Sequence, residues 1–261
     1  MGLRLRVLVT FAVEAEFASW RLRRGFARRR LPEHDGAARC YSALVGQSHV
    51  DVLITGMAVR KGEPGLSLLL QEGADICISS GLAGALLPGL VWGEIAVARR
   101  LAVLGGEEKR DSDPRLVELA IEMGATGVDT FLTSDSVLGS SEVKRRSAVQ
   151  GDVVEMESFS IVARASEKWI PSVAIRAISD TAEEDLPIDF NRAMNSRGEV
   201  KLSAVLSQIA RRPGQLPKLI RFGKRSEEAA NRLSDFLDAY VQALDSESLD
   251  RELGVQNRGA K

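Results

Sequence analysis

Short apolar runs alternate along this chain with stretches whose apolar residues recur at helical spacing. Strands are predicted at residues 5–10, 50–55, 75–79, 94–98 and 172–178. Helices are predicted at residues 13–26, around Leu66, Leu69 and Leu70, and at 114–123 and 158–168. Asp113 is the expected N-cap of the third of these helices, with Pro114 as its first residue. This alternation predicts an α/β fold in which helices flank a mixed, largely parallel central sheet.

The C-terminal part has a different pattern. Residues 198–211 predict a helix, residues 212–214 interrupt it, and residues 227–244 predict a last amphipathic helix. Residues 245–261 are polar, and we expect them to be disordered. We therefore expect one domain over residues 1–244, with a helical extension that starts at about residue 198.

Composition narrows the class of protein. The chain has 261 residues, of which 44% are hydrophobic and 27% charged, and its net charge of −1 argues against a nucleic-acid partner. No apolar run is long enough to span a bilayer and no signal peptide is apparent. Cys40 and Cys77 form no CxxC pair, which favours reduced core thiols and the cytoplasm.

Several kinds of cofactor site are also unsupported. His34 and His49 cannot supply a three-histidine metal site, and we expect both at the surface or in loops. The glycine-rich signatures of dinucleotide and triphosphate binding are missing. We expect no metal and no cofactor.

Carboxylates follow two of the predicted strands and one further buried run. Glu14 and Glu16 come after the first strand, Glu157 follows a buried run at the start of a helix, and Asp180 comes just past residue 178. Carboxyl ends of strands open into the cleft of an α/β protein, so these groups are candidates for a substrate site. Each also has a plain alternative, because acids favour helix N-termini and Asp180 suits a turn.

Taken together, these elements resemble the nucleoside phosphorylase and nucleosidase superfamily, which contains methylthioadenosine/adenosylhomocysteine nucleosidase. The resemblance spans about residues 5–180 and is most specific at residues 154–157 (VEME) and 176–180 (RAISD). The segment at residues 80–84, the downstream residues 88–95 and Glu16 support it. Leu186-Pro187, Gly198 and residues 211–217 further resemble the hopanoid-associated phosphorylases of bacteria, whose substrate is taken to be adenosylhopane.

The resemblance implies an enzyme that cleaves the N-ribosidic bond of a 5′-substituted adenine nucleoside. Asp180, with a proton affinity raised by burial, would protonate the base at N7, and Ser179 would orient it. An ionised Glu157 would hold the ribose hydroxyls and favour the cationic sugar of the transition state. Met156 would pack beneath the sugar, and Glu16 would activate the attacking water.

The remaining candidates bind substrate or support the site. The backbone at Val137 and Leu138 would face the base, and Arg176 would order neighbouring strands rather than touch substrate. Glycines and small residues after the strand at 75–79 would let the backbone approach the ligand closely. The further substrate-binding candidates are Glu155, Gly81, Leu82, Ala83 and Gly84.

Some positions depart from the family pattern. Leu82 replaces a usual serine, and Val137 replaces a phenylalanine that stacks on adenine, at a cost on the order of 1 kcal/mol. Residues 99–113 are also short compared with nucleosidases, so methylthioadenosine is not the preferred substrate. Ser79 stands where hexameric phosphorylases have a phosphate-binding arginine, although Arg60 or Lys61 could substitute. Hydrolysis and phosphorolysis, with inorganic phosphate as co-substrate, both remain open, and Glu16 favours water.

The remaining expectations concern the functional class and the partners. The alternative to an enzyme is a non-catalytic nucleoside-binding protein. We expect the chain to form a homodimer. Two basic clusters, one at residues 21–30 and one at residues 211–225, are most simply solvated surface. In the second cluster apolar residues are interleaved with the basic ones, so peripheral contact with the inner membrane surface is the alternative.

Overall fold

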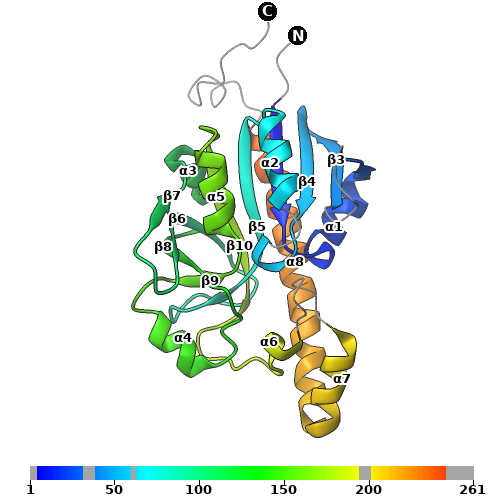
Figure 1. The fold of residues 1–261 in the computed structure, drawn as a ribbon, viewed down its shortest axis with the longest axis vertical. Coiled ribbons are helices and arrows are strands. Elements are labelled where there is room, and N and C mark those ends of the chain that lie inside the picture. Colours follow the sequence, from blue (N-terminus) through cyan, green and yellow to red (C-terminus); the bar gives the residue numbers. More distant parts are fainter. Residues whose placement is uncertain (1–4, 32–38, 60–62, 194–200, 245–261) are drawn as a thin grey trace, which may run out of the picture.

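The computed structural model describes residues 5–31, 39–59, 63–193 and 201–244, except for the side chain of Leu202. Helices lie on both faces of a twisted sheet, and a helical hairpin projects beyond one end of it (Figure 1). The strands are β1 (Arg6–Phe11), β2 (Ala27–Arg29), β3 (Arg39–Val45), β4 (Ser48–Ile54), β5 (Ile76–Ala85), β6 (Ile95–Val103), β7 (Lys109–Asp111), β8 (Thr126–Thr133), β9 (Val153–Glu155) and β10 (Ser172–Asp180). The α-helices are α1 (Glu14–Arg24), α2 (Glu63–Gln71), α3 (Pro114–Glu122), α4 (Ser141–Ser147), α5 (Ser158–Ser166), α6 (Phe190–Ala193), α7 (Leu202–Arg211) and α8 (Leu216–Leu244), and two 3-10 turns occupy Met57–Val59 and Pro213–Gln215.

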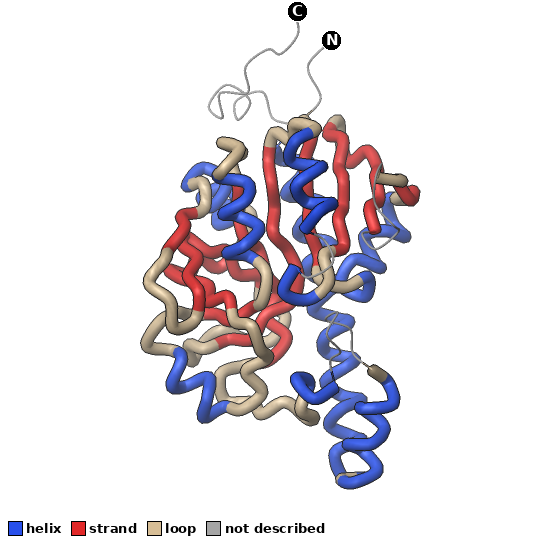
Figure 2. Tube along the Cα trace, viewed as in Figure 1, coloured by secondary structure: helices blue, strands red, loops and turns tan. Residues whose placement is uncertain are grey.

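The predicted mixed α/β fold is confirmed. Strand β5 pairs in parallel with β1 on one side and with β10 on the other, and its last residues pair with β9. Strand β10 continues through β6, β8 and β9 back to β5, so five strands close a ring. From β1 the sheet continues outward through β4, β3 and β2 (Figure 2). Strand β5 is therefore shared by the ring and the open sheet.

The two faces of β1 and β5 follow the alternation of their side chains. Leu8 and Cys77 pack in the cluster that includes α2 and α5, whereas Val7, Val9 and Ile76 pack in the cluster that includes α1 and α8. Successive side chains of a strand point to opposite faces, so this segregation needs apolar residues at consecutive positions. Both cysteines are buried free thiols, as predicted.

Strand β5 is longer than predicted. Its pairing with β10 continues past Gly81, through Arg176↔Gly81 and Asp180↔Gly84, so the expectation that the strand ends at Gly81 is wrong. Small residues in this stretch allow the backbone to remain in the sheet while side chains from other elements approach it. Strand β10 likewise runs to Asp180, which is its last residue rather than a residue of the following turn.

Helices α1 and α8 pack together against one face of the sheet. Trp20 donates from Nε1 to Asp238 Oδ1 at 2.8 Å, and Arg24 makes two hydrogen bonds to the same carboxylate at 2.6 and 2.5 Å. Arg23 pairs with Asp235 of α8. The first basic cluster is thus partly neutralised between helices rather than wholly solvated.

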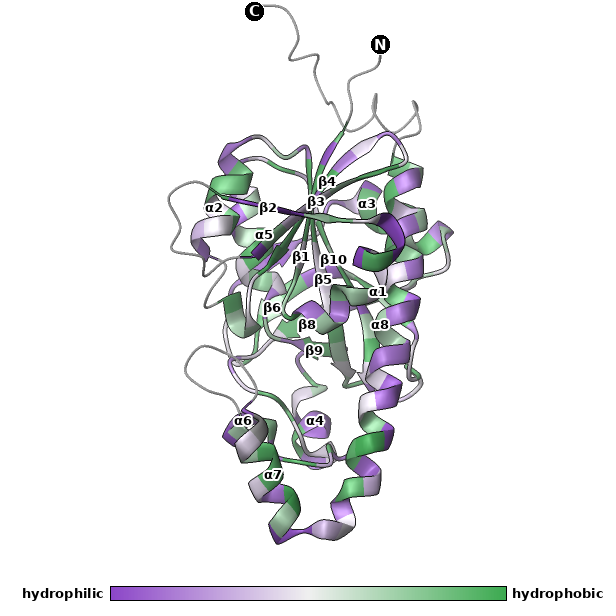
Figure 3. Ribbon diagram, turned by 90° about the vertical axis from the view of Figure 1, so that its right-hand side faces the viewer, coloured by the Kyte–Doolittle hydropathy of each residue, from purple (hydrophilic) through white to green (hydrophobic). Residues whose placement is uncertain are grey.

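The C-terminal extension is a hairpin of α7 and α8. The predicted interruption occurs as a 3-10 turn at Pro213–Gln215, and α8 then begins earlier than predicted and continues without a break for 29 residues. Its first half and α7 project away from the sheet, and the two helices carry both polar and apolar residues (Figure 3). Gly198 and the predicted disordered tail at 245–261 lie outside the described residues.

Candidate active site

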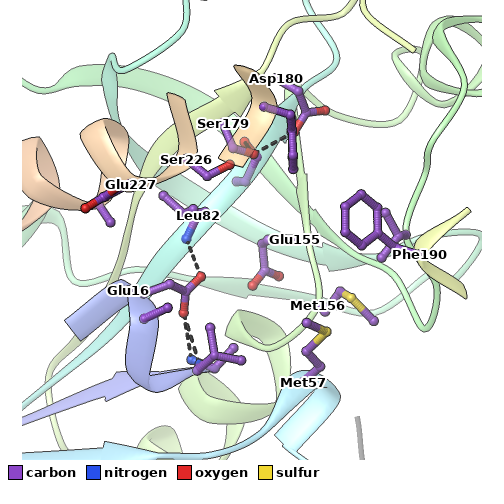
Figure 4. A pocket seen from close by; sticks show the side chains of 18 of the residues that line it. Glu16, Met57, Leu82, Glu155, Met156, Ser179, Asp180, Phe190, Ser226 and Glu227 are labelled. Atoms are coloured by element: carbon purple, nitrogen blue, oxygen red, sulfur yellow. Dashed lines mark hydrogen bonds between the residues drawn. The ribbon is translucent and has the colours of Figure 1, made fainter. Parts of the chain in front are cut away.

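A cavity of about 800 Å³ opens where β5, β9 and β10 end (Figure 4). Its walls come from the start of α1, the segment at residues 136–138, the junction of β9 and α5, helix α6 and the middle of α8. Of the catalytic and substrate-binding residues that the resemblance implies, all except Gly81 line this cavity: Glu16, Leu82, Ala83, Gly84, Val137, Leu138, Glu155, Met156, Glu157, Ser179 and Asp180. The three carboxylates Glu16, Glu157 and Asp180 therefore face one space.

Asp180 is held by hydrogen bonds to both of its oxygens. The Ser179 hydroxyl lies 2.6 Å from Oδ1, which agrees with its predicted orienting role. Lys144 of α4 donates from Nζ to Oδ2 at 2.5 Å, and also to the carbonyl oxygens of Thr181 and Glu184 at 2.8 and 3.0 Å. Three acceptors around one amino group fit an ammonium with its three N–H bonds.

This arrangement changes the expected state of Asp180 in the empty site. Lys144 Nζ has three acceptors, as an ammonium requires, so Asp180 Oδ2 accepts a hydrogen bond from Lys144 instead of carrying the expected proton. The lysine side chain is completely buried, and the side chain of Asp180 is 9% exposed. The sequence did not indicate this pair, because Lys144 looks like one more basic residue in the run Lys144-Arg145-Arg146.

Glu16 holds the start of α1 against the end of β5. Its Oε2 accepts hydrogen bonds from the backbone N–H of Ala12 at 3.1 Å and Val13 at 3.2 Å, and its Oε1 accepts one from Leu82 at 2.9 Å. A Cβ at Gly81 would lie 3.1 Å from Oε1, so the glycine makes room for this carboxylate. Burial raises the pKa of Glu16, which suits a group that takes a proton from water.

Glu14, the neighbouring candidate, points elsewhere. It accepts a hydrogen bond from the Tyr41 hydroxyl and pairs with Arg39 at 2.9 Å. The Tyr41 hydrogen bond, more than the Arg39 charge, lowers the pKa of Glu14. Its position does not allow a role in the cavity, because it is absent from the cavity wall.

Glu157 is buried beside other acids. Its Oε1 accepts a hydrogen bond from Ala58 N at 3.0 Å, and its Oε2 lies 3.7 Å from the Arg176 guanidinium. Burial, and then the charge of Glu155, raise the pKa of Glu157 to about 8, and Arg176 opposes the shift. This shift favours the protonated form of Glu157 in the empty site, and an ionised Glu157 beside the ribose stays a prediction.

Glu155 and Arg176 support the site from beneath. Glu155 Oε2 accepts hydrogen bonds from the backbone N–H of Glu157 at 2.9 Å and Ser158 at 2.8 Å, and from Arg176 at 2.6 Å. Its Oε1 accepts the Thr133 hydroxyl. Both oxygens are thus engaged by protein groups, one of them by the Arg176 guanidinium, and the side chain is fully buried, so we assign Glu155 to positioning rather than to the predicted substrate binding. Arg176 is fully buried and, as predicted, ties strands together.

The segment expected to face the base is bound by a side chain of α6. Asn191 accepts from Val137 N at 2.8 Å through Oδ1 and donates to Val137 O at 2.8 Å through Nδ2. Both polar backbone groups of Val137 are therefore engaged in this structure, and the Leu138 side chain is buried in the wall. No pattern in the sequence pointed to Asn191.

Part of the cavity wall is apolar. It is formed by Leu22 of α1, Leu186, Phe190 of α6 and Phe222 of α8. The rings of Phe190 and Phe222 lie 5.7 Å apart. The sequence indicated none of these four residues as part of the site.

Two kinds of feature are absent from the described part of the chain. Its His, Cys, Asp and Glu side chains form no group of three that could hold a metal ion. Its helices include none that is long and apolar enough to cross a bilayer.

Known proteins share both the sequence pattern and the fold. The 5′-methylthioadenosine/S-adenosylhomocysteine nucleosidase of Geobacillus thermodenitrificans is 26% identical over 185 residues, which cover 60% of this chain and 78% of that protein. The aminodeoxyfutalosine nucleosidase of Campylobacter jejuni is 27% identical over 168 residues, 54% of this chain and 71% of that protein. The solved structure of Helicobacter pylori 5′-methylthioadenosine/S-adenosylhomocysteine nucleosidase with butyl-thio-DADMe-Immucillin-A has a TM-score of 0.71 at 18% identity, and the match covers 93% of this chain and 100% of that one.

A family model gives the assignment. The model described as "Phosphorylase superfamily" matches residues 65–211, more than half of the chain, and this range contains β5, β9 and β10 with the carboxylates Glu157 and Asp180. The predicted superfamily is confirmed, and the hopanoid-associated subgroup stays a prediction. This chain therefore belongs to the phosphorylase superfamily.

Proposed function

We propose that this protein hydrolyses the N-ribosidic bond of a purine nucleoside, and that the nucleoside is an adenosine with a bulky apolar 5′ substituent. The relatives named above support an enzyme that breaks an N-glycosyl bond. The observation that carries the proposal is the convergence of Asp180, Glu157 and Glu16 on one cavity. A pure binding protein has little use for both a leaving-group acid and a water-activating base.

The chemistry follows from the separate environments of these acids. A proton passes from the site of Asp180 to N7 of the base, and the electron pair of the C1′–N9 bond moves to the base as that bond breaks. The ionised form of Glu157 favours the ribosyl cation left behind. Because burial raises the pKa of Glu157, the carboxyl group must first release its proton to solvent as the nucleoside binds. Glu16 takes a proton from water while the water oxygen bonds to C1′.

Phe190 supplies the aromatic group that position 137 lacks. It stands on α6 next to Asn191, which is bonded to Val137, and its ring reaches into the cavity near Met156 (Figure 4). Stacking of an aromatic ring on the base contributes on the order of 1 kcal/mol. We propose that Phe190 packs against the nucleoside in place of the usual phenylalanine.

The apolar part of the cavity wall, formed by Leu22, Leu186, Phe190 and Phe222, supports the proposal of an apolar 5′ group. The surface of Leu22 is 83% exposed, yet it forms part of the wall together with Phe222. An exposed leucine beside a cavity is a surface that an apolar ligand would cover. Adenosylhopane, the substrate suggested by the resemblance at residues 186–217, has such a 5′ group and is our proposed substrate.

Water is the preferred nucleophile over phosphate. Ser79 is completely buried and hydrogen-bonded to Ser158 and Arg176, so it is not placed to hold phosphate. Arg60 and Lys61, the proposed substitutes, lie outside the described residues. Glu16 remains available for water. Phosphorolysis of the same bond is the alternative, and it alone would yield ribose 1-phosphate.

The test is base release from a series of 5′-substituted adenosines, with and without inorganic phosphate. We expect adenine to be released without phosphate, with kcat/KM rising as the 5′ group changes from methylthio to a long hydrocarbon. Ribose 1-phosphate among the products would replace hydrolysis by phosphorolysis. Nucleoside binding in calorimetry without any base release would favour the non-catalytic binding protein.

We further propose that the α7–α8 hairpin contacts an anionic membrane surface, from which an apolar substrate would be drawn. Of the described side chains from Lys201 to Glu228, none is buried. Residues 201–226 contain no acid and seven basic residues: Lys201, Arg211, Arg212, Lys218, Arg221, Lys224 and Arg225. Leu206, Leu216 and Ile220 are about half exposed among them, at 59%, 45% and 52%. Each basic residue near an anionic surface contributes about 1 kcal/mol.

Vesicle sedimentation tests this contact. The intact protein should sediment with vesicles that contain anionic lipid, less so as salt rises, and not with neutral vesicles. The triple variant Arg211→Glu, Arg212→Glu, Lys218→Glu should stay in the supernatant, whereas a matched reversal at exposed Arg145 and Lys168 should not change the result. Equal sedimentation of both variants would refute the proposal. We retain the homodimer as a proposal, which the mass of the protein in solution would test.

A further inference from the structure

The buried amino group of Lys144 has no counterpart among the residues that the resemblance predicted. Its side chain is completely buried at the base of the cavity wall. A buried lysine is costly unless its charge is paired and its N–H bonds are satisfied, and here all three have acceptors. One of these acceptors is the carboxylate proposed to serve the leaving base.

The backbone carbonyls fix the lysine independently of Asp180. Thr181 O and Glu184 O belong to the turn that follows β10, and they lie 2.8 and 3.0 Å from Nζ. The Glu184 side chain pairs instead with Arg225 at 2.7 Å. Nζ is therefore anchored by main-chain atoms, and its third N–H points at Asp180 Oδ2.

Gly84 leaves the space in which this pair forms. A Cβ at position 84 would lie 2.9 Å from Asp180 Oδ2, closer than carbon and oxygen atoms pack. On the other oxygen, the Ser179 hydroxyl is 2.6 Å from Oδ1 and 3.1 Å from Ala83 O. Three elements thus hold the carboxylate in one orientation, with one oxygen against the ammonium.

We infer that Lys144 is a positioning residue that stores the proton which Asp180 delivers to the leaving base. The inference rests on the proposed function, since it concerns the source of the proton in that reaction. An N–H bond of Lys144 breaks as an O–H bond forms on Asp180, and that O–H bond breaks as N7–H forms on the base. The electron pair of the glycosidic bond leaves with the base, and Lys144 is left as a neutral amine.

The cycle closes without another reactant. Glu16 gains a proton from the attacking water as Lys144 loses one, so exchange of one proton with solvent restores both groups. The pair of Lys144 and Asp180 can protonate the base as long as the two groups share one proton. An isolated carboxyl group loses its proton at much lower pH than an ammonium does, by roughly six pH units between unperturbed groups. The lysine therefore extends activity toward alkaline pH.

Few other titratable groups surround Lys144. Asp185 accepts a hydrogen bond from Ser141 N at 2.7 Å, and this bond, with a smaller effect of Lys144, lowers the pKa of Asp185. Glu184 is paired with Arg225 as described. Glu16, Glu155 and Glu157 line the same cavity, and they are common to the wild type and to any Lys144 variant. Comparison of the two proteins therefore isolates the lysine.

The pH profile of kcat tests the inference. In Lys144→Met we expect kcat at neutral pH to fall by at least 100-fold, and the alkaline limb of the profile to move down by one pH unit or more. The control Lys168→Met, at an exposed lysine after α5, should match the wild type. If kcat of Lys144→Met is reduced by the same factor at every pH, the role of Lys144 is purely structural and the inference is overturned.

A measurement on the wild type keeps the inference testable even if Lys144→Met does not fold. In nitrogen-15 NMR of labelled lysines, we expect a protected ammonium signal at pH 7 that is lost in Lys144→Arg. A neutral amine in its place, or no protected signal, would overturn the inference whatever the activity. If the wild type releases no base from any nucleoside, the proposed function fails, and the proton-storage role fails with it.

Discussion

Replacement of Gly84 by alanine tests how the geometry of Asp180 controls turnover. The added Cβ would lie 2.9 Å from Asp180 Oδ2 and 3.4 Å from Val154 Cγ1. The second distance is an ordinary contact, so the methyl group acts mainly on the carboxylate. Relief of the first contact requires a shift of about half an ångström, since carbon and oxygen atoms seldom approach within about 3.4 Å.

Asp180 cannot absorb this shift without loss of its partners. Its Oδ2 is 2.5 Å from Lys144 Nζ, and its Oδ1 is held by Ser179. A misplacement of about 1 Å in a catalytic group costs on the order of 100-fold in rate. For the smaller shift at Gly84→Ala we expect kcat to fall by roughly 10- to 100-fold, or about 1.4–2.8 kcal/mol in activation free energy.

The assay is steady-state adenine release, with circular dichroism and thermal melting to confirm that the variant folds. Gly214→Ala is the matched control, because a Cβ there meets no atom within 4 Å. A folded Gly84→Ala protein with kcat within about twofold of the wild type would refute the argument that this orientation of Asp180 matters.

Three further predictions concern stability and substrate binding. Arg176→Met should lower the free energy of unfolding by about 3–5 kcal/mol in urea titrations, because Glu155 loses its buried partner, and a loss below 1 kcal/mol would contradict this. The pKa of Glu157 is raised from about 4.5 in the unfolded chain to about 8 in the folded protein. Protonation of Glu157 therefore stabilises the fold, fully so below pH 4.5, and this contribution is lost as pH rises through about 8. In thermal melting, the wild type should therefore lose stability relative to Glu157→Gln between pH 5 and pH 9. A difference in Tm between the two proteins that does not vary with pH would exclude the raised pKa of Glu157. Phe190→Ala should raise KM by about 5- to 10-fold with little change in kcat, and an unchanged KM would remove the proposed contact with the nucleoside.

Periodicity predicted the elements whose apolar residues recur regularly. The strands at β1, β4 and β10 and the helices α1, α3 and α5 were located to within a few residues. The end of β5 was misplaced, because glycines that usually end a strand here sit inside one and leave room for Glu16 and Asp180. Strand β3 was missed because polar and small residues interrupt its apolar pattern.

The carboxylates of the site were predictable, whereas their supports were not. Glu16, Glu157 and Asp180 follow strands, and their motifs resemble a known superfamily. Lys144 became visible only with the fold, because nothing in the sequence distinguishes a buried lysine on α4 from its exposed neighbour Arg145. The contact between Asn191 and Val137 was equally hidden in the sequence, because it joins segments that are distant along the chain.

Turnover by Asp180→Asn tests the central claim most directly. The amide keeps the shape of the side chain but has no carboxylate oxygen to receive and pass on a proton. We predict that the variant folds and binds nucleoside with a Kd close to that of the wild type, while single-turnover base release slows by about 100- to 10,000-fold. Base release by Asp180→Asn at a rate near that of the wild type would contradict the account.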